Sequence, residues 1–270
     1  MSNQRLSKVF ESCKAEGRSA LVSYLTAGDP TPAISRQLML SLAARSDIIE
    51  IGMPFSDPMA DGPVIQAASE RALEAGTHIQ DVFEITRTVR QANPDLGIVL
   101  MGYANIPYTM GFETFAKRAT DAGADGLLLV DIPPEEGHIC DGILAAHGLD
   151  RILLLSPTST DERIRLACDS GTGFIYYVSL TGITGADMGN VAEIRAKTEH
   201  IQSMTDMPVC VGFGVKTPEQ AAAVGAFADG VVVGSHFVSQ ITKISGEQAI
   251  SEALSNSASA MKEAISGARS

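Results

Sequence analysis

The strongest constraint on the fold is a pattern that repeats along the whole chain. A short apolar run is followed by a turn of Gly, Pro or Asp, and then by a segment with helical periodicity. There are eight apolar runs, at residues 20–26, 47–52, 97–103, 125–131, 151–156, 174–179, 208–212 and 229–234. Strands that alternate with helices in this way predict βα units built around a parallel sheet.

Several of these runs are continuously apolar rather than alternating, as in Leu127-Leu128-Leu129-Val130. Strands of this kind are buried on both faces, which is typical of a parallel sheet covered by helices. Eight units favour a (β/α)8 TIM barrel in the α/β class, formed by residues 1–270 as a single domain. The alternative is a Rossmann-like sheet, but the turn after the first run is Thr26-Ala27-Gly28-Asp29-Pro30 rather than Gly-x-Gly-x-x-Gly.

The segments between the runs predict the helices of the barrel. They cover residues 33–44, 66–74, 79–91, 112–122, 135–147, 161–170, 191–204 and 218–224. An additional N-terminal helix at 6–15 and a last helix at 247–265 flank the eight units. Thr31, Thr160 and Thr217 stand where N-capping residues are expected.

Composition restricts the classes of partner. The chain has 32 acidic and 20 basic residues and a formal net charge of −12, which argues against nucleic acid or an anionic membrane as the partner. The sequence shows no signal-peptide pattern and no uninterrupted apolar stretch of about 18 residues. The four cysteines form no C-x-x-C pair. We therefore expect a cytoplasmic protein with reduced thiols.

The second apolar run carries the densest group of candidate catalytic residues. Glu50 lies between Ile49 and Ile51, and the loop after it leads to Asp61. In one interpretation Glu50 pairs with an arginine across the barrel mouth and Asp61 caps the helix near Pro63. In the other, which we favour, burial raises the pKa of Glu50 so that it serves as a general acid and base, and Asp61 supplies a second, ionised carboxylate.

Glycine turns follow the last two runs, at Gly212-Phe213-Gly214-Val215 and Gly234-Ser235. In (β/α)8 enzymes the loops after strands seven and eight often bind phosphate through backbone N–H groups, so we expect a phosphorylated small-molecule substrate. Residues 179–190 are rich in small residues and suit a lid over the site. The five histidines show no metal-binding spacing, and Lys216 is expected to be an exposed residue at a helix start rather than a Schiff-base lysine.

With these motifs in place, the chain resembles the tryptophan synthase α-subunit family over essentially its whole length. The resemblance is carried by Ile49-Glu50-Ile51-Gly52-Met53-Pro54-Phe55-Ser56-Asp57-Pro58-Met59-Ala60-Asp61-Gly62-Pro63. Supporting matches are Thr26-Ala27-Gly28-Asp29-Pro30, Tyr103-Ala104-Asn105, Asp131-Ile132-Pro133, Gly182-Ile183-Thr184-Gly185, Gly212-Phe213-Gly214 and Gly234-Ser235.

The resemblance implies retro-aldol cleavage of indole-3-glycerol phosphate to indole and glyceraldehyde 3-phosphate, a step of tryptophan biosynthesis. Glu50 is then the acid and base, and Asp61 holds the indole N–H. The implied substrate-binding residues are Tyr24, Tyr103, Tyr176, Thr184, Gly185, Phe213, Gly214, Gly234 and Ser235. One departure from the family is Leu180, where some members have arginine.

The resemblance also implies that this chain binds no metal and no cofactor of its own. Indole would pass through a tunnel to a β subunit that carries pyridoxal phosphate, in an α2β2 heterotetramer. Two other functions stay open from the sequence. The chain could be mainly a binding and activating subunit with weak or lost catalysis, or the same barrel could act on another phosphorylated intermediate.

Overall fold

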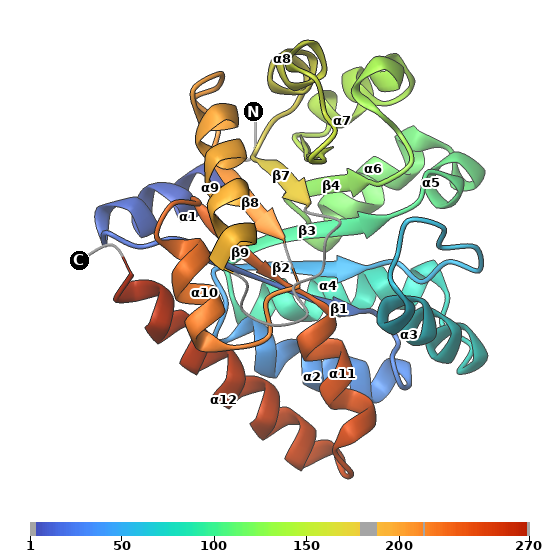
Figure 1. The fold of residues 1–270 in the computed structure, drawn as a ribbon. Helices are drawn as coiled ribbons and strands as arrows, with labels where there is room; N and C mark the ends of the chain where they lie inside the picture. The colour runs from blue at the N-terminus through green and yellow to red at the C-terminus, as the bar shows by residue number, and fades with distance from the viewer. Residues whose placement is uncertain (1–3, 179–187, 213, 269–270) are drawn as a thin grey trace.

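The computed structural model describes residues 4–178, 188–212 and 214–268. In this part of the chain nine parallel strands form one sheet, in the order β5-β4-β3-β2-β1-β9-β8-β7-β6. They are β1 (Ala20–Thr26), β2 (Ile48–Gly52), β3 (Gly97–Gly102), β4 (Gly126–Leu129), β5 (Asp150–Arg151), β6 (Leu153–Leu155), β7 (Ile175–Val178), β8 (Val209–Gly212) and β9 (Gly230–Val233). Only Ile152 separates the two outermost strands β5 and β6, so the sheet closes into a barrel (Figure 1).

Helices surround this barrel. They are α1 (Arg5–Ala15), α2 (Pro32–Ala43), α3 (Pro63–Glu74), α4 (Ile79–Ala92), α5 (Asn105–Met110), α6 (Phe112–Ala122), α7 (Asp141–Ala146), α8 (Asp161–Ser170), α9 (Met188–Gln202), α10 (Pro218–Gly225), α11 (Ser235–Lys243) and α12 (Glu247–Ser266), with a 3-10 helix η1 at Pro134–Ile139. Three of the predicted N-caps are confirmed, because the side chains of Thr31, Thr160 and Thr217 accept hydrogen bonds from backbone N–H groups in the first turns of α2, α8 and α10.

The predicted (β/α)8 TIM barrel is confirmed. Each of the eight predicted apolar runs overlaps a strand, and the run at 151–156 covers the second residue of β5 and the whole of β6. The reason for the split is a change of partner along this run, since Asp150 and Arg151 pair with β4 whereas Leu153 and the residues after it pair with β7. Strands such as β1 and β2 are buried along their whole length, as their continuous apolar runs indicate.

The inside of the barrel is filled in layers, because alternate residues of a strand point inward. The lower layer contains one residue from each of the eight predicted apolar runs: Val22, Ile48, Val99, Leu128, Ile152, Phe174, Cys210 and Val232. The upper layer contains the residues that lie two positions later in the sequence: Tyr24, Glu50, Met101, Val130, Leu154, Tyr176, Gly212 and Gly234. This period of two directs Glu50 into the barrel, toward the carboxyl ends of the strands.

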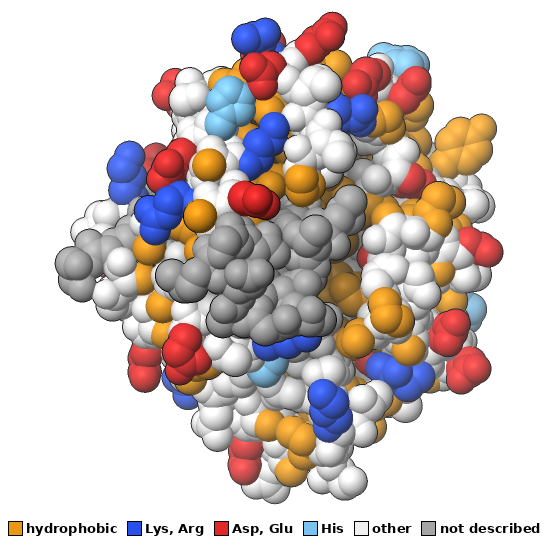
Figure 2. Space-filling view, viewed as in Figure 1, with side chains coloured by type: hydrophobic (Ala, Val, Ile, Leu, Met, Phe, Trp, Pro, Cys, Tyr) orange, Lys and Arg blue, Asp and Glu red, His pale blue; other side chains and the backbone are white. Residues whose placement is uncertain are grey.

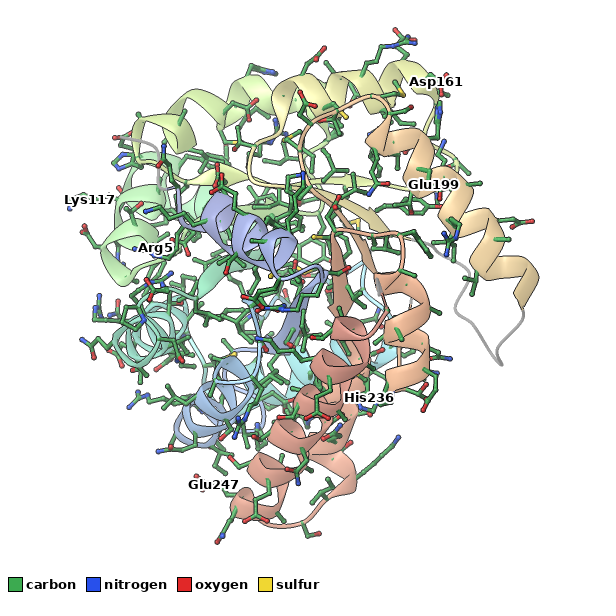
Figure 3. The ribbon with its side chains drawn as sticks, turned by 90° about the vertical axis from the view of Figure 1, so that its left-hand side faces the viewer. Arg5, Lys117, Asp161, Glu199, His236 and Glu247 are labelled. Carbon is green, nitrogen blue, oxygen red and sulfur yellow. The ribbon has the colours of Figure 1, made fainter. Side chains whose placement is uncertain are left out.

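The additional N-terminal helix α1 closes the opposite end of the barrel. Its apolar residues Leu6, Phe10 and Cys13 belong to the same buried cluster as the lower layer, and Phe10 contacts Phe174 edge to face with ring centroids 5.7 Å apart. Figure 3 shows α1 lying across this end, with Arg5 at its start. A site open to small molecules is therefore expected at the other end, where the strands finish.

Three helix predictions differ from the structure. The predicted helix 135–147 is divided into η1 and α7, with Cys140 between them. The two short helices α5 and α11 were not predicted as helices, although α11 buries Phe237, Val238 and Ile241 at helical spacing. In each case the segment is six to nine residues long, so its periodicity covers too few turns to stand out from the surrounding loop.

Candidate active site

A cavity of about 690 Å³ lies at the carboxyl ends of the strands. Five of the predicted site residues line it: Asp61, Tyr176, Gly214, Gly234 and Ser235. Its apolar floor is made by residues of the upper layer and their neighbours: Met101, Val130, Leu154, Leu155 and Val178. A cavity that combines an apolar floor with a few polar groups at its edges suits a ligand with an aromatic part and a polar part.

Glu50 lies in the same layer as this floor, on β2. It pairs in register with Tyr24 on β1 and with Val99 on β3. Only 1% of its surface is exposed, and it is not among the residues that line the cavity. Burial raises the pKa of the Glu50 carboxyl to about 8, so this carboxyl is protonated at neutral pH.

The two interpretations of Glu50 can now be separated. Among the described residues no arginine or lysine forms an ion pair with Glu50, and its buried Oε1 has no hydrogen-bond partner. An unpaired buried carboxyl is costly to the fold. Its presence here favours the acid/base interpretation over a structural ion pair.

Asp61 stands at the end of the loop between β2 and α3, at the edge of the cavity. Gly62 occupies the N-cap position of α3, and no side chain caps this helix. Asp61 is therefore not the helix cap that the alternative interpretation expects. Partial burial raises the pKa of Asp61, while a hydrogen bond from Tyr103 lowers it.

Tyr103 supports Asp61 and lies outside the cavity lining. Its hydroxyl donates to Asp61 Oδ2 at 3.2 Å and accepts from the Ala60 N–H at 3.0 Å. Its ring stacks on Phe55 from the same loop, with centroids 5.1 Å apart. Although the sequence predicts Tyr103 as a substrate-binding residue, the described hydrogen bonds and ring contact of its side chain are with the loop that carries Asp61.

Two further tyrosines surround Glu50 in the upper layer. Tyr176 lines the cavity, whereas Tyr24 is 5% exposed and its Oη lies 3.1 Å from Thr26 Oγ1. The hydroxyl of Tyr24 lies over Gly52 and that of Tyr176 over Gly212, where an added Cβ would approach them to 2.2 and 2.4 Å. Glycine at these strand ends thus makes room for the aromatic rings that keep water away from Glu50.

The glycine turns lie where a phosphate site is expected. Gly214 has φ +71, a backbone conformation that favours glycine, and nothing lies within 4 Å of where its Cβ would be. Gly234 precedes Ser235, the first residue of α11, and both line the cavity. Lys216 is exposed and its backbone N–H bonds Gln220 Oε1 at the start of α10, as expected for a helix-start lysine.

Some predicted residues lie outside the described part of the chain. These are Thr184, Gly185 and Phe213, together with Leu180 and most of the predicted lid. Within the described ranges no cluster of three or more His, Cys, Asp or Glu side chains is arranged to hold a metal ion.

The structure also adds residues that the sequence did not single out. Met101, Val130 and Leu154 line the cavity floor, and each lies two residues after a member of the lower layer. Applying the inward period of two to all strands would have found them. Gln66 on α3 bonds the main chain of Asp61, and nothing in the local sequence indicates this contact.

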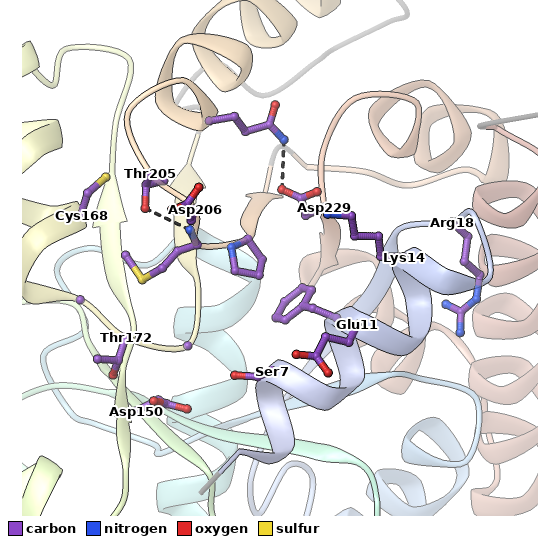
Figure 4. A pocket seen from close by; sticks show the side chains of 16 residues that line it. Ser7, Glu11, Lys14, Arg18, Asp150, Cys168, Thr172, Thr205, Asp206 and Asp229 are labelled. Carbon is purple, nitrogen blue, oxygen red and sulfur yellow. Dashed lines mark hydrogen bonds between the residues drawn. The ribbon is translucent and has the colours of Figure 1, made fainter. Parts of the chain in front are cut away.

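A second cavity of about 810 Å³ lies at the amino ends of the strands, beside α1. Figure 4 shows its lining of mixed polarity, including Glu11, Lys14, Asp150 and Asp206. None of the predicted site residues lies there. Active sites of (β/α)8 enzymes lie at the carboxyl ends of the strands, so the cavity of about 690 Å³ at those ends is the candidate active site.

Comparisons with known proteins agree with this fold. The sequence profile of the tryptophan synthase alpha chain family matches residues 10–266. The chain is 46% identical over 263 residues to the tryptophan synthase alpha chain of Marinobacter nauticus, with 97% of each chain covered. It is 47% identical over 263 residues to that of Thioalkalivibrio sulfidiphilus, covering 95% of this chain and 99% of the relative.

Solved structures show the same similarity. The crystal structure of tryptophan synthase subunit alpha from Legionella pneumophila matches with a TM-score of 0.87 and 40% identity, over 98% of each chain. A crystal structure of tryptophan synthase from M. tuberculosis in the aminoacrylate-bound form matches with a TM-score of 0.85 and 34% identity, over 97% of this chain and 100% of that one. The chain therefore belongs to the tryptophan synthase alpha chain family, and it functions as an alpha subunit in tryptophan biosynthesis.

Proposed function

We propose that the cavity binds indole-3-glycerol phosphate and that Glu50 and Asp61 carry out its cleavage to indole and glyceraldehyde 3-phosphate. The single observation that carries this assignment of roles is the state of Glu50. It is a buried carboxyl without an ion-pair partner among the described residues, with its pKa raised to about 8. A carboxyl with a pKa near the working pH can both give and take a proton.

Glu50 acts first as an acid and then as a base. The protonated carboxyl transfers its proton to C3 of the indole ring, which leaves positive charge on the ring and centred on its nitrogen. The resulting carboxylate takes the proton of the hydroxyl on the side-chain carbon bonded to C3. As that hydroxyl becomes an aldehyde, the bond from C3 breaks and its electron pair returns to the ring, so indole and glyceraldehyde 3-phosphate form with all atoms and charges balanced.

Asp61 stabilises the charge that develops on the ring. Its ionised carboxylate accepts a hydrogen bond from the indole N–H, and this interaction strengthens as the ring becomes positive. Tyr103, which donates to the same carboxylate, favours the ionised form. Because the protonated ring itself accepts the electron pair, the cleavage uses no cofactor from this chain.

The indole ring and the phosphate of the substrate bind to different parts of the cavity, the apolar floor and the glycine turns. The indole ring lies on the apolar floor beside Tyr176, and Tyr24 lies beside Glu50, with which it pairs in register. The phosphate lies against Gly214, Gly234 and Ser235, where the start of α11 offers backbone N–H groups and a favourable dipole. The roles of Thr184, Gly185 and Phe213 stay predictions from the family resemblance.

The partner is a β subunit that carries pyridoxal phosphate, in an α2β2 heterotetramer that receives the indole. Apolar side chains exposed near the site support a docking surface, since Met59 is 81% exposed and Tyr108 is 75% exposed. Figure 2 shows hydrophobic side chains on the same edge of the molecule, over α5. Sedimentation of the mixed subunits tests the stoichiometry.

Two further predictions concern the whole chain. Residues 1–270 form one barrel domain, and the protein works in the cytoplasm. No helix in the described part of the chain is long and apolar enough to cross a membrane.

Release of indole from indole-3-glycerol phosphate, with and without a β subunit, tests the proposed reaction. Glu50→Gln is expected to lower kcat by about 100-fold or more, because it removes the proton transfer. Glu70→Gln is the matched control, since Glu70 is an exposed glutamate on α3. Activity of Glu50→Gln within twofold of the unaltered chain would refute the mechanism. Binding of the substrate without any cleavage would instead favour a binding and activating subunit.

A further inference from the structure

The loop that presents Asp61 has few attachments to the rest of the barrel. It leads from β2 to α3 and extends beyond the carboxyl end of the sheet (Figure 1). Within the loop, the Asp61 N–H donates to the Pro58 carbonyl at 3.0 Å and so closes a turn. From outside, Tyr103 holds the loop at the Ala60 N–H and at the Asp61 carboxylate.

Gln66, the fourth residue of α3, supplies another attachment. Its side-chain amide donates to the Asp61 carbonyl at 2.7 Å and to the Pro58 carbonyl at 3.4 Å. Among the described residues no backbone N–H bonds the Asp61 carbonyl. Gln66 therefore joins the first and last residues of the turn to the helix that follows.

We propose that Gln66 is a positioning residue for the cleavage. It holds the main chain of Asp61 in place, so that the Asp61 carboxylate faces the indole N–H. This inference rests on the proposed function of Asp61. The carbonyl bond fixes the main chain of Asp61 from the α3 side, while Tyr103 fixes the carboxylate from the β3 side. With both ends held, the carboxylate is in place before charge develops on the ring.

The chemistry of the amide explains why glutamine suits this position. Its NH2 group donates two hydrogen bonds and carries no charge. A lysine or arginine here would place a cation next to the Asp61 carboxylate, where it would compete with the indole N–H for that acceptor. A neutral donor holds the loop while leaving the carboxylate available to the substrate.

Kinetics of indole release by the full chain with its β subunit test this role. Gln66→Met keeps the length of the side chain but removes both donors, so kcat is expected to fall about tenfold, the order of one lost hydrogen bond. KM is expected to change less than threefold, because the contacts to phosphate and ring remain. Gln248→Met is the matched control. Gln248 also lies in the first turns of a helix, and among the described residues its side chain donates only to exposed Glu252, at 3.0 Å.

A second background separates positioning from a general loss of structure. In Asp61→Ala no side-chain acceptor remains for Gln66 to position, so adding Gln66→Met is expected to have less than a twofold effect, measured over hours with enzyme in excess over substrate because cleavage is slow. The same tenfold loss in both backgrounds, an unchanged kcat in Gln66→Met, or a rise in KM with no fall in kcat would overturn the proposal. If the unaltered complex released no indole, the proposed function itself would fail, and this outcome is distinct from those three.

Discussion

Replacing Glu50 by glutamine is expected to change how the stability of the protein depends on pH. The pKa of Glu50 is about 8 in the folded state against 4.5 for an unperturbed glutamate. Between these two values the unfolded chain releases the proton while the folded chain keeps it. The free energy of unfolding therefore falls as pH rises, by about 1.4 kcal/mol per pH unit. The contribution is fully present below pH 4.5 and is lost as pH rises to about 8.

The size of the effect follows from the interval that is measured. Between pH 5.5 and 7.5 the unaltered chain should lose about 2 to 3 kcal/mol through this one group. Glu50→Gln cannot ionise and should not show that loss, so its stability relative to the unaltered chain should improve by the same amount. Any fixed cost of packing the amide is equal at the two pH values and cancels in this difference.

Urea unfolding followed by far-UV circular dichroism at both pH values measures the difference. Working above pH 5.5 keeps the protein away from its pI of about 4.8, where its net charge is small. Glu70→Gln, at an exposed position, should follow the unaltered chain at both pH values. Parallel pH dependence in Glu50→Gln and the unaltered chain would refute the claim that Glu50 is buried as a neutral acid.

Three other perturbations test neighbouring parts of the site. The kcat/KM for indole release should fall above pH 8, because Glu50 must be protonated in the free enzyme to protonate the ring; a profile that stays level to pH 9 would contradict this. Tyr103→Phe removes a hydrogen bond that lowers the pKa of Asp61, so the acidic limb of the kcat/KM profile should move to higher pH and kcat should fall about tenfold. An acidic limb that does not move would show that Asp61 is not the group whose titration produces it. Arg71→Ala removes the guanidinium that bonds the fully buried Asp29 carboxylate at 2.8 and 2.7 Å. The free energy of unfolding, measured in urea, should therefore fall by about 3 kcal/mol. A loss under 1 kcal/mol would mean that the ion pair contributes little to stability.

Local patterns in the sequence carry most of the fold. A buried parallel strand needs apolar residues on both faces, and a helix that covers it needs apolar residues at a period of 3.6, so both leave a signal within a few residues. The apolar run at 20–26 coincides with β1, and the threonines at three helix starts cap α2, α8 and α10. Where a helix was too short for its period to show, as in α5 and α11, the prediction failed.

Sequence also singled out the two proposed catalytic carboxylates, because an acid inside an apolar strand and a second acid in the loop after it are unusual for a strand end. What surrounds them was decided by the closed barrel. Glu50 becomes a neutral acid because the closed barrel buries it. Tyr24 from β1, which pairs in register with Glu50, and Tyr176 from β7 belong to the same layer although they lie far away along the chain.

The attachments of Asp61 have the same origin. Tyr103 reaches it from the end of β3, across 42 residues, and Gln66 reaches back from α3. The sequence by itself determined the order of strands and helices and the types of the proposed catalytic groups, since those depend on local periodicity and composition. Their protonation states and positions depend on desolvation and on hydrogen bonds between distant segments, which exist only once the strands have closed into the barrel.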